Sequence, residues 1–242
     1  FRLYWSGNIN RSDIIDAFGI SKQQASNDLA NYIDGRKSNL AYDKRLRTYV
    51  RGKNFRPRFM EPDASEFFSQ LQAVDQGVLQ EDRSWVTPLP SFGAPPAPVR
   101  GVKPDTLRDI VAAIRASQGV HVLYQSFSRP EPTWRWIEPH SLAFDGFRWH
   151  ARAFCRNDAA FKDFLLSRII DIEGFDEGAR PLEIDHAWNS EVVLKIGPHP
   201  DLSDVQKHVI GLDYGMEDGV TQIRVRKAML YYTLKRLGLD TD

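Results

Sequence analysis

The chain has 242 residues, of which 42% are hydrophobic and 26% are charged, and its 32 basic residues balance 32 acidic ones. This length suffices for two or three small domains, and the composition excludes a wholly disordered protein. No run is long and apolar enough for a transmembrane span and no secretory signal is visible, so we expect no membrane partner. Because the chain begins at Phe1 rather than Met, we expect it to be a segment of a longer protein.

The charges are distributed unevenly along the chain. Residues Phe1–Met60 hold 12 of the 32 basic residues but only 5 of the 32 acidic ones, so this segment carries +7 and the remainder −7. A basic segment on an acidic body indicates that the segment meets a polyanion, although a solvated basic surface has the same composition. The one cysteine, Cys155, excludes an internal disulfide and fits a reducing, cytoplasmic location.

Two short helices joined by a glycine are predicted within the basic segment. The first is Arg11–Phe18, Gly19 supplies the turn, and the second is Lys22–Tyr32. Ser21 and Gln24 have the spacing of a capping box, in which the Ser21 hydroxyl accepts from the Gln24 amide and Gln24 reaches back. This order is typical of a helix-turn-helix, while two ordinary helices of a bundle remain the alternative.

The second helix leaves a polar face outside, and a strand pair follows it. Gln, Asn, Ser and Lys side chains can hydrogen-bond base edges and phosphates in the major groove of a duplex. Strands are predicted at Asn39–Tyr42 and Arg47–Arg51, with a basic tip at Asp43-Lys44-Arg45 between them. The sequence therefore predicts a winged helix-turn-helix that binds double-stranded DNA. The expected DNA-binding residues are Ser21, Lys22, Gln23, Gln24, Ser26, Asn27, Lys44, Arg45 and Arg47.

A connecting region separates this head from the rest of the chain. A capping box at Asp63-Ala64-Ser65-Glu66 opens a helix that is expected to run to about Leu79. Between Trp85 and Gly101 an extended linker is expected, because this segment holds five prolines. They are Pro88, Pro90, Pro95, Pro96 and Pro98. The next helix is predicted at Pro104–Ala116, with a buried face of Leu107, Ile110, Val111 and Ile114.

Residues Val120–Ile170 are predicted to form short, aromatic-rich strands. The first, Val120–Phe127, alternates, so that Val122, Tyr124 and Ser126 share one face. The further elements expected are strands at Thr133–Phe144 and Phe147–Cys155 around an Asp145-Gly146 hairpin, a helix near Ala159–Phe164 and a last strand near Leu165–Ile169.

Several basic side chains are set among these strands. His150 and Arg152 share one strand face, and His140 and Arg168 lie at strand ends. A buried cation needs water, a carboxylate or an anionic ligand, because an unpaired buried charge is costly. Arg, His, Tyr and Ser together suit a nucleotide or a nucleic-acid fragment. Pairing inside the protein, for example of Arg168 with Asp163 or Glu138, is equally open on residue types alone.

The stretch PHSLAFDGFRWHARAFC, followed by FKDFLLSRI, resembles the WYL domain, a small Sm-like barrel of bacterial regulators. The name-giving triplet stands here as Trp149-His150-Ala151, so only its Trp is retained. Nearly the whole chain resembles the CapW/BrxR group of transcription factors, which control bacterial anti-phage defence genes. The resemblance implies a winged-helix repressor with a ligand-sensing domain. It also implies a nucleotide or nucleic-acid ligand. From their residue types and strand positions, the residues expected to hold it are Tyr124, Ser126, His140, His150, Arg152 and Arg168.

A final segment alternates strand and helix. Strands are predicted at Glu191–Ile196 and Val220–Val225, and helices at Leu202–Ile210, stopped by Gly211, and Ala228–Leu237, stopped by Gly238. This tail resembles the extension through which WYL regulators dimerise, so a homodimer is expected. The pattern does not separate core from interface for its apolar residues, which are Val205, Val209, Leu230, Leu234 and Leu237.

The fold class expected from these elements is α+β, with a winged helix-turn-helix, a linker helix, an Sm-like β-barrel WYL domain and a C-terminal α/β dimerisation extension. The corresponding domains are 1–60, 61–102, 103–182 and 183–242. No known catalytic or metal-binding motif is present, so we expect neither an enzyme, a catalytic residue, a metal site nor a cofactor. A nuclease built on Glu131, Glu138, Asp163 and Asp171 is the enzymatic alternative.

Two functions from different classes fit this organisation. The first is a cytoplasmic, homodimeric repressor of a phage-defence operon, which binds double-stranded operator DNA and is released by a ligand in the WYL domain. The second is an RNA- or single-stranded-DNA-binding module that acts mainly through the Sm-like barrel. Relative affinity for a duplex palindrome and for a single strand distinguishes them.

Overall fold

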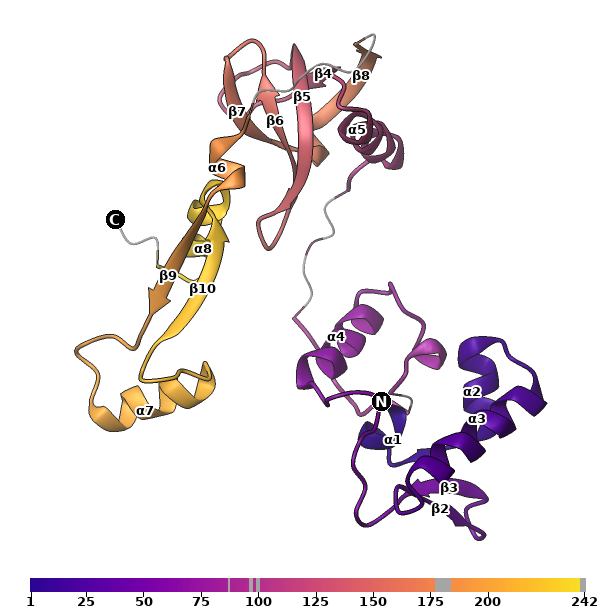
Figure 1. Cartoon of the computed structure of the whole chain (residues 1–242). Coiled ribbons are helices and arrows are strands. Elements are labelled where there is room, and N and C mark those ends of the chain that lie inside the picture. The colour runs from indigo at the N-terminus through magenta and orange to yellow at the C-terminus, as the bar shows by residue number, and fades with distance from the viewer. Residues whose placement is uncertain (87, 96–97, 99–100, 177–183, 240–242) are drawn as a thin grey trace. The chain divides into compact units, whose positions relative to one another are not determined.

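Two compact units make up the protein, Phe1–Ala97 and Pro98–Asp242 (Figure 1). The structure, a computed structural model, describes residues 1–86, 88–95, 98, 101–176 and 184–239. The expected boundary between the third and fourth domains falls within 177–183, outside the described residues.

The first unit is a helix-turn-helix beside a three-stranded sheet. Its sheet has the order β1-β3-β2, with antiparallel pairing throughout. The two-residue strand β1 was not predicted, because so short a segment carries no alternation. The elements are α1 (Arg2–Trp5), β1 (Asn8–Ile9), α2 (Arg11–Phe18), α3 (Lys22–Gly35), β2 (Leu40–Asp43), β3 (Thr48–Arg51), α4 (Ala64–Asp75) and the 3-10 helix η1 (Glu81–Arg83).

Local capping explains where α2 and α3 begin. Asn10 and Asp13 form a reciprocal capping box at the start of α2, and Gly19 ends that helix in the left-handed conformation, at φ 63°. Ser21 caps α3 by accepting from the Gln24 amide at 3.1 Å. The side chain of Gln24 does not reach back, because it donates to Asp28 at 2.7 Å instead.

Helix α4 is shorter than predicted. Asp63 caps it by accepting from the amide of Ser65, and the helix ends at Asp75 instead of near Leu79. Gly77 adopts a left-handed backbone just beyond that end, and Val78 lies exposed outside the helix. The described residues between Ser84 and Lys103 form no helix or strand, and Pro96 lies outside the described residues.

The second unit contains a five-stranded antiparallel sheet with the order β7-β6-β5-β4-β8. Because no pairing closes the described sheet between β7 and β8, the expected Sm-like barrel is not confirmed. The elements up to this point are α5 (Pro104–Ala116), β4 (Val120–Tyr124), β5 (Thr133–Phe144), β6 (Trp149–Cys155), β7 (Ala160–Leu165), η2 (Leu166–Arg168) and β8 (Ile169–Phe175).

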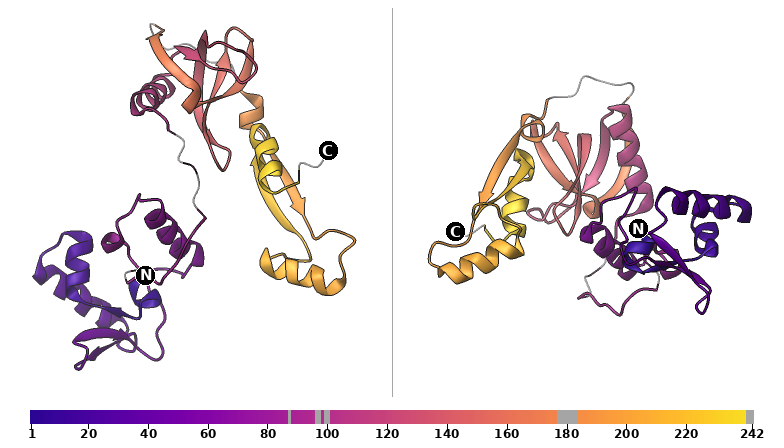
Figure 2. Two further views of the ribbon diagram at one scale, coloured as in Figure 1. Left: turned by 180° about the vertical axis from the view of Figure 1, so that it is seen from behind. Right: turned by 60° about the horizontal axis from the view of Figure 1, so that its bottom comes forward.

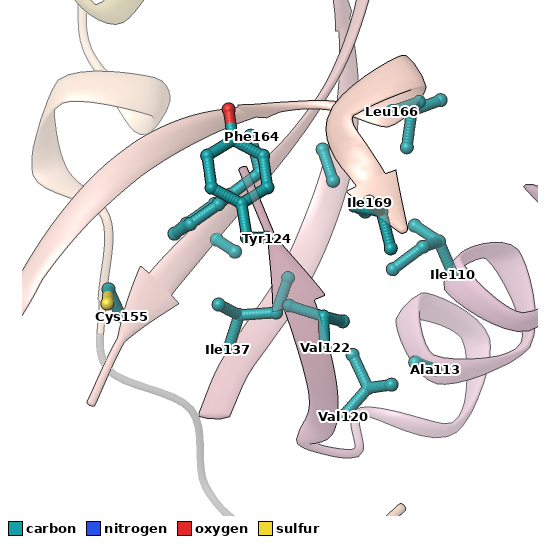
Figure 3. Close-up of a cluster of buried hydrophobic side chains, with 12 residues drawn as sticks. Ile110, Ala113, Val120, Val122, Tyr124, Ile137, Cys155, Phe164, Leu166 and Ile169 are labelled. Carbon is teal, nitrogen blue, oxygen red and sulfur yellow. The ribbon is translucent and has the colours of Figure 1, made fainter. Parts of the chain in front are cut away.

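One face of this sheet packs against α5 and η2 to form the core (Figure 3). Ile110 and Ala113 of α5 lie against Val120 and Val122 of β4 and Ile137 of β5, and all five are fully buried. Leu107 is exposed on α5, contrary to the predicted face, because Thr106 and Ala113 take the inward positions beside Ile110. Cys155 is also buried in this core.

Two predicted elements between Ala159 and Ile169 are wrong. The expected helix at Ala159–Phe164 is the strand β7, which pairs with β6 from Cys155↔Ala160 to His150↔Leu165. The expected strand at Leu165–Ile169 is the 3-10 turn η2 followed by the longer strand β8. Short apolar runs do not distinguish helix from strand by periodicity, and here the hairpin partner decides.

The C-terminal residues form a two-stranded ribbon with helices around it (Figure 2). The antiparallel register runs from Glu191↔Arg226 to Ile196↔Thr221. Gly211 does not stop α7, which continues to Asp213. The elements are α6 (His186–Asn189), β9 (Glu191–Ile196), α7 (Asp204–Asp213), β10 (Thr221–Arg226), η3 (Lys227–Met229) and α8 (Leu230–Arg236).

Candidate nucleic-acid interface and ligand site

Helix α3 is anchored by two buried residues, which fix the face it presents. Ala25 is 0% exposed and Leu29 is 6% exposed, and both lie on the side that packs in the first unit. Lys22, Gln23 and Asn27 are consequently on the exposed side. The packing thus gives α3 a polar outer face, as the sequence predicts.

The side chains of α3 are partly ordered by contacts with one another. Gln23 Nε2 donates to Asn27 Oδ1 at 3.3 Å, so these two amides form a pair with further donor and acceptor capacity. Ser26 Oγ donates to the carbonyl of Lys22 at 2.8 Å. Ser21 and Gln24, by contrast, are engaged in capping and with Asp28, and both roles are structural.

The wing is the hairpin of β2 and β3. Asp43 accepts from the amides of Arg45 and Leu46 at 2.8 and 2.9 Å, which closes the turn at the tip. Arg47 follows with a left-handed backbone, at φ 52°. Lys44, Arg45 and Arg47 are all exposed on this turn.

A hollow of about 610 Å³ lies between the two helices and the wing. It brings together three of the predicted DNA-binding residues, Lys22, Ser26 and Arg47, whereas Gln23, Asn27, Lys44 and Arg45 do not line it. The other residues that line the hollow were not predicted from the sequence. The position of Arg11 directly after the Asn10 cap is a signal that could have identified this one residue. The remaining lining residues are Asn10, Arg11, Ser12, Ile15, Leu29, Tyr42 and Tyr49.

The six predicted ligand-binding residues are not brought together at one place. Tyr124 lies in the core, where its ring packs edge-on against Phe164 and its hydroxyl accepts from the amide of Leu165 at 3.3 Å. Strand β4 ends at Tyr124, so Ser126 belongs to the following turn and not to the strand face. His150 and Arg152 point to the opposite face of the sheet, because their neighbour Ala151 is in the core.

Arg152 is the centre of a buried polar network on that outer face. Its Nε donates to Asp185 at 2.7 Å and its Nη1 to Asp163 at 3.2 Å. His140 also contacts Asp185, with 3.2 Å between Nε2 and the carboxylate oxygen. Tyr232 of α8 donates to the second oxygen of Asp163 at 2.9 Å. The network therefore joins β5, β6 and β7 to the start of α6 and to α8.

His150 belongs to a second group beside this network. Its Nε2 donates to Asp145 at 3.0 Å, and its ring packs against Tyr232 with the centroids 5.4 Å apart. Burial alone raises the pKa of Asp145, but hydrogen bonds from His150, Arg148 and the backbone amides of Phe147 and Arg148 hold that pKa well below its ordinary value. Burial lowers the pKa of His140 despite the carboxylate of Asp185.

Arg168 occupies a third place, away from these carboxylates. Its guanidinium lies 5.5 Å from the ring centroid of Phe127, which is 91% exposed. Neither partner considered from the sequence pairs with it, because Asp163 binds Arg152 and Glu138 binds Arg156 at 2.7 Å. Ser126 and Ser128 lie in the same turn as Phe127, with their hydroxyls 2.9 Å apart.

Metal chemistry has no visible site in the part of the chain that the structure describes. No group of three or more His, Cys, Asp or Glu side chains there is placed to hold a metal ion. Of the acidic residues considered for a nuclease, Glu138 and Asp163 are held in ion pairs with Arg156 and Arg152. None of the helices in the described residues is both long and apolar enough to cross a membrane.

Comparison with protein families matches three parts of the chain. Residues 1–73 match the BrxR transcriptional regulator winged helix-turn-helix domain, residues 105–173 the WYL domain, and residues 191–242 the BrxR transcriptional regulator C-terminal dimerization domain. The solved structure of proteasome accessory factor B/C (PafBC) of Arthrobacter aurescens is similar over 58% of this chain and 24% of its own, at 22% identity and a TM-score of 0.27.

Curated relatives match over the full length of the chain. The DNA-binding transcriptional repressor CapW of Stenotrophomonas maltophilia is 40% identical over 99% of this chain and 81% of its own. The repressors of the same name from Escherichia coli (strain KTE188) and Pseudomonas aeruginosa are 37% and 36% identical, over 99% and 100% of this chain and 80% and 81% of theirs. The protein therefore belongs to the BrxR/CapW family of WYL-domain transcriptional regulators.

Proposed function

We propose that this protein is a homodimeric, sequence-specific DNA-binding transcriptional repressor. The observation that carries the proposal is the exposed polar face of α3 beside a basic wing, in a segment with a charge of +7. Relatives that share 36–40% identity over the whole chain are DNA-binding transcriptional repressors. The genes it represses are proposed to be those of a phage-defence operon, as the family resemblance implies.

In this proposal α3 reads the operator from the major groove. Gln23 and Asn27 are exposed amides four residues apart, and such amides can make bidentate hydrogen bonds to adenine. Lys22 and the wing residues Lys44, Arg45 and Arg47 supply positive charge for the phosphates, which fixes position without reading sequence. A dimer of such heads requires an operator with two related half-sites.

The C-terminal segment is proposed to provide the dimer contact. Helix α7 carries Val205, Val209 and Leu212 at a spacing of four and three residues, and they are 75%, 49% and 69% exposed. That spacing puts them in one stripe on the outer side of the helix. An exposed apolar stripe of this kind indicates a protein interface, and the segment matches a dimerization domain.

A nucleotide or nucleic-acid ligand is proposed to release the DNA by binding the WYL domain. Arg168 and Ser126 are the residues best suited to meet it, because a guanidinium beside an exposed aromatic ring offers both charge and stacking. His140, His150 and Arg152 already contact carboxylates, although the buried Nδ1 of His150 has no hydrogen-bond partner among the described residues. Such a switch needs a ligand that binds one arrangement of the dimer better than the other.

The ligand proposal is tested by Arg168→Ala. This variant should bind the operator as the wild type does but fail to release a reporter gene when cells meet the inducing condition. The expected reason is loss of the charge that holds an anionic ligand, with no change in α3 or the wing. Normal induction by Arg168→Ala would remove Arg168 from the ligand site.

The DNA-binding proposal is tested by a gel shift with the DNA upstream of the protein's own gene. We expect a discrete complex on that duplex and none on a scrambled duplex of equal length at the same salt concentration. A single-stranded version of the same sequence serves as the third probe. Equal binding to the operator and scrambled duplexes would contradict sequence-specific repression.

A single-stranded nucleic acid as the main partner is the second candidate. His121 lies between Trp134 and Trp136 on the outer sheet face, with ring centroids 4.9 and 4.8 Å apart, and base stacking on such rings favours single strands. Tighter binding of the single-stranded probe than of the duplex, lost in Trp134→Ala, would favour this candidate over the repressor.

A further inference from the structure

Positively charged side chains gather at the hollow between α2, α3 and the wing. Arg11, Lys22 and Arg47 line it from three different elements. We propose that this hollow is the seat of one backbone phosphate of the operator in each half-site. The proposal rests on the DNA-binding function proposed above, and it assigns to Arg11 a role in positioning the recognition helix.

The cations of the hollow are free to meet an anion. Among the described residues, none of Arg11, Lys22 and Arg47 takes part in an ion pair. The acidic residues nearest in sequence to Arg11 and Arg47 are occupied elsewhere, because Asp13 binds Arg2 at 3.3 Å and Asp43 closes the wing turn. Three cations around one concavity repel each other, so an anion at their centre is favoured.

Arg11 is held in position before any ligand arrives. Its Nη1 donates to Ser26 Oγ at 3.1 Å, and Ser26 in turn donates to the carbonyl of Lys22 at 2.8 Å. These two bonds fix the first residue of α2 against the first turn and a half of α3. Only part of the Arg11 guanidinium is used by Ser26, so the other N–H groups remain for phosphate oxygens.

Two tyrosines on the wing complete the seat. Tyr42 and Tyr49 face each other across β2 and β3, with ring centroids 5.1 Å apart and edge-to-face rings. Both line the hollow, and Tyr42 is more than half exposed. Their hydroxyls are neutral donors and their rings are apolar, a combination that suits a phosphate and its sugar more than a base edge.

The seat therefore separates positioning from reading. Gln23 and Asn27 do not line the hollow and remain available for bases, while Arg11 and Arg47 hold the backbone. Residues of α2 and of the wing contact the DNA backbone on two sides of α3. The seat therefore sets the depth and register of α3 in the major groove. Lys44 and Arg45, at the wing tip, lie outside it.

The test combines protein variants with operator duplexes in which one phosphate is replaced by a neutral methylphosphonate. The 242-residue chain is titrated against a set of such duplexes at one salt concentration. The wild type is expected to lose about tenfold in affinity when the seated phosphate in a half-site is neutralised, as for one charged hydrogen-bonded contact. Arg11→Ala and Arg47→Gly should lose about tenfold on the unmodified operator.

The same two variants should show little further loss on the duplex that lacks that phosphate charge. Arg47→Gly is chosen because glycine accepts the left-handed backbone at this position, so folding is preserved. Lys53→Ala is the matched control, since Lys53 is an exposed cation of the same unit that does not line the hollow. It should keep the wild-type sensitivity at the seated phosphate.

Two outcomes overturn the proposal, and they are distinguishable. If Arg11→Ala and Arg47→Gly keep the wild-type sensitivity at every neutralised phosphate while specific binding persists, the seat is wrong and the repressor function stands. If the wild type does not distinguish the operator from a scrambled duplex, the repressor function is wrong and the seat falls with it.

Discussion

Arg152 is held by two carboxylates, whereas Arg168 has an aromatic ring as its neighbour. The side chain of Arg152 is 10% exposed and that of Asp185 is 3% exposed, so removing the cation leaves a buried carboxylate with only His140 and the amide of Trp188 as partners. Two arginines that are alike in sequence thus have different roles. Arg152 stabilises the junction between the sheet and the C-terminal segment, and Arg168 is left for the ligand site proposed above.

Arg152→Ala should lower the free energy of unfolding by about 3–5 kcal/mol, the usual cost of breaking a buried pair. Arg168→Ala should change it by no more than about 0.5–1 kcal/mol, because no described carboxylate loses a partner. Urea denaturation of both variants and of the wild type measures the difference. Wild-type stability in Arg152→Ala would mean that the network does not hold this junction.

Acid should weaken the same junction. Burial lowers the pKa of His140, and hydrogen bonds lower the pKa values of Asp145 and Asp185 although burial opposes them. For each group the unfolded chain binds protons more readily, so stability rises with pH and is lost as pH falls. The loss should begin near the ordinary His pKa of about 6.5 and steepen below about pH 4.

Thermal unfolding between pH 7 and pH 3.5 checks this prediction, with Asp145→Asn as the variant. The substitution removes one of the carboxyl groups whose pKa is lowered in the folded protein. The variant should therefore be less stable at pH 7, and its stability should fall less as the pH is lowered. A melting temperature that rises as pH falls from 7 to 5 would contradict the sign derived for His140.

At the scale of elements, capping and hairpin signals predicted the fold best. Helices α2 and α5 and strands β5 and β9 have the predicted bounds, because polar caps, prolines and tight turns act locally. The helix predicted at Ala159–Phe164 is a strand because a distant partner, β6, pairs with it. Tertiary pairing of this kind leaves no mark in a short apolar run.

The candidate sites were predictable to different degrees for the same reason. The outer face of α3 follows from helical spacing alone: Lys22, Gln23 and Asn27 are exposed there, and Ser26 is half-buried. The prediction of the ligand residues depended on which sheet face each side chain occupies. Tyr124 lies in the core at the end of β4, whereas Ser126 follows that strand and lies outside it. Asp185 was not recognised, because its partner Arg152 lies 33 residues away.

The exposed apolar stripe of α7 can be tested by substitution. Val205→Glu combined with Leu212→Glu should convert the dimer into monomers, because two charges replace exposed apolar groups that a partner would bury. Light scattering at micromolar concentration measures the mass. Lys207→Glu is the control, because Lys207 is two residues from both valines and so lies on another side of the helix. A variant that stays dimeric with wild-type mass would place the interface elsewhere.

At the scale of the whole molecule, the two compact units carry different proposed functions. The unit Phe1–Ala97 carries the face proposed to read DNA, and the unit Pro98–Asp242 carries the WYL domain and the segment proposed for dimerisation. The contacts of Arg152 with Asp163 and Asp185 join the WYL domain to the C-terminal segment within the second unit. These ion pairs thus connect the domain proposed to bind a ligand with the segment proposed to form the dimer.

Whether α3 is the recognition helix is tested by the affinity of the 242-residue chain for its operator and for a scrambled duplex at one salt concentration. The proteins compared are the wild type, Gln23→Ala and Asn27→Ala. Each substitution should cost about 1–3 kcal/mol on the operator and almost nothing on the scrambled duplex. Lys22→Ala should weaken both duplexes alike, because a phosphate contact carries no sequence information. If Gln23→Ala and Asn27→Ala both keep wild-type affinity for the operator, α3 is not the recognition helix and the account is contradicted.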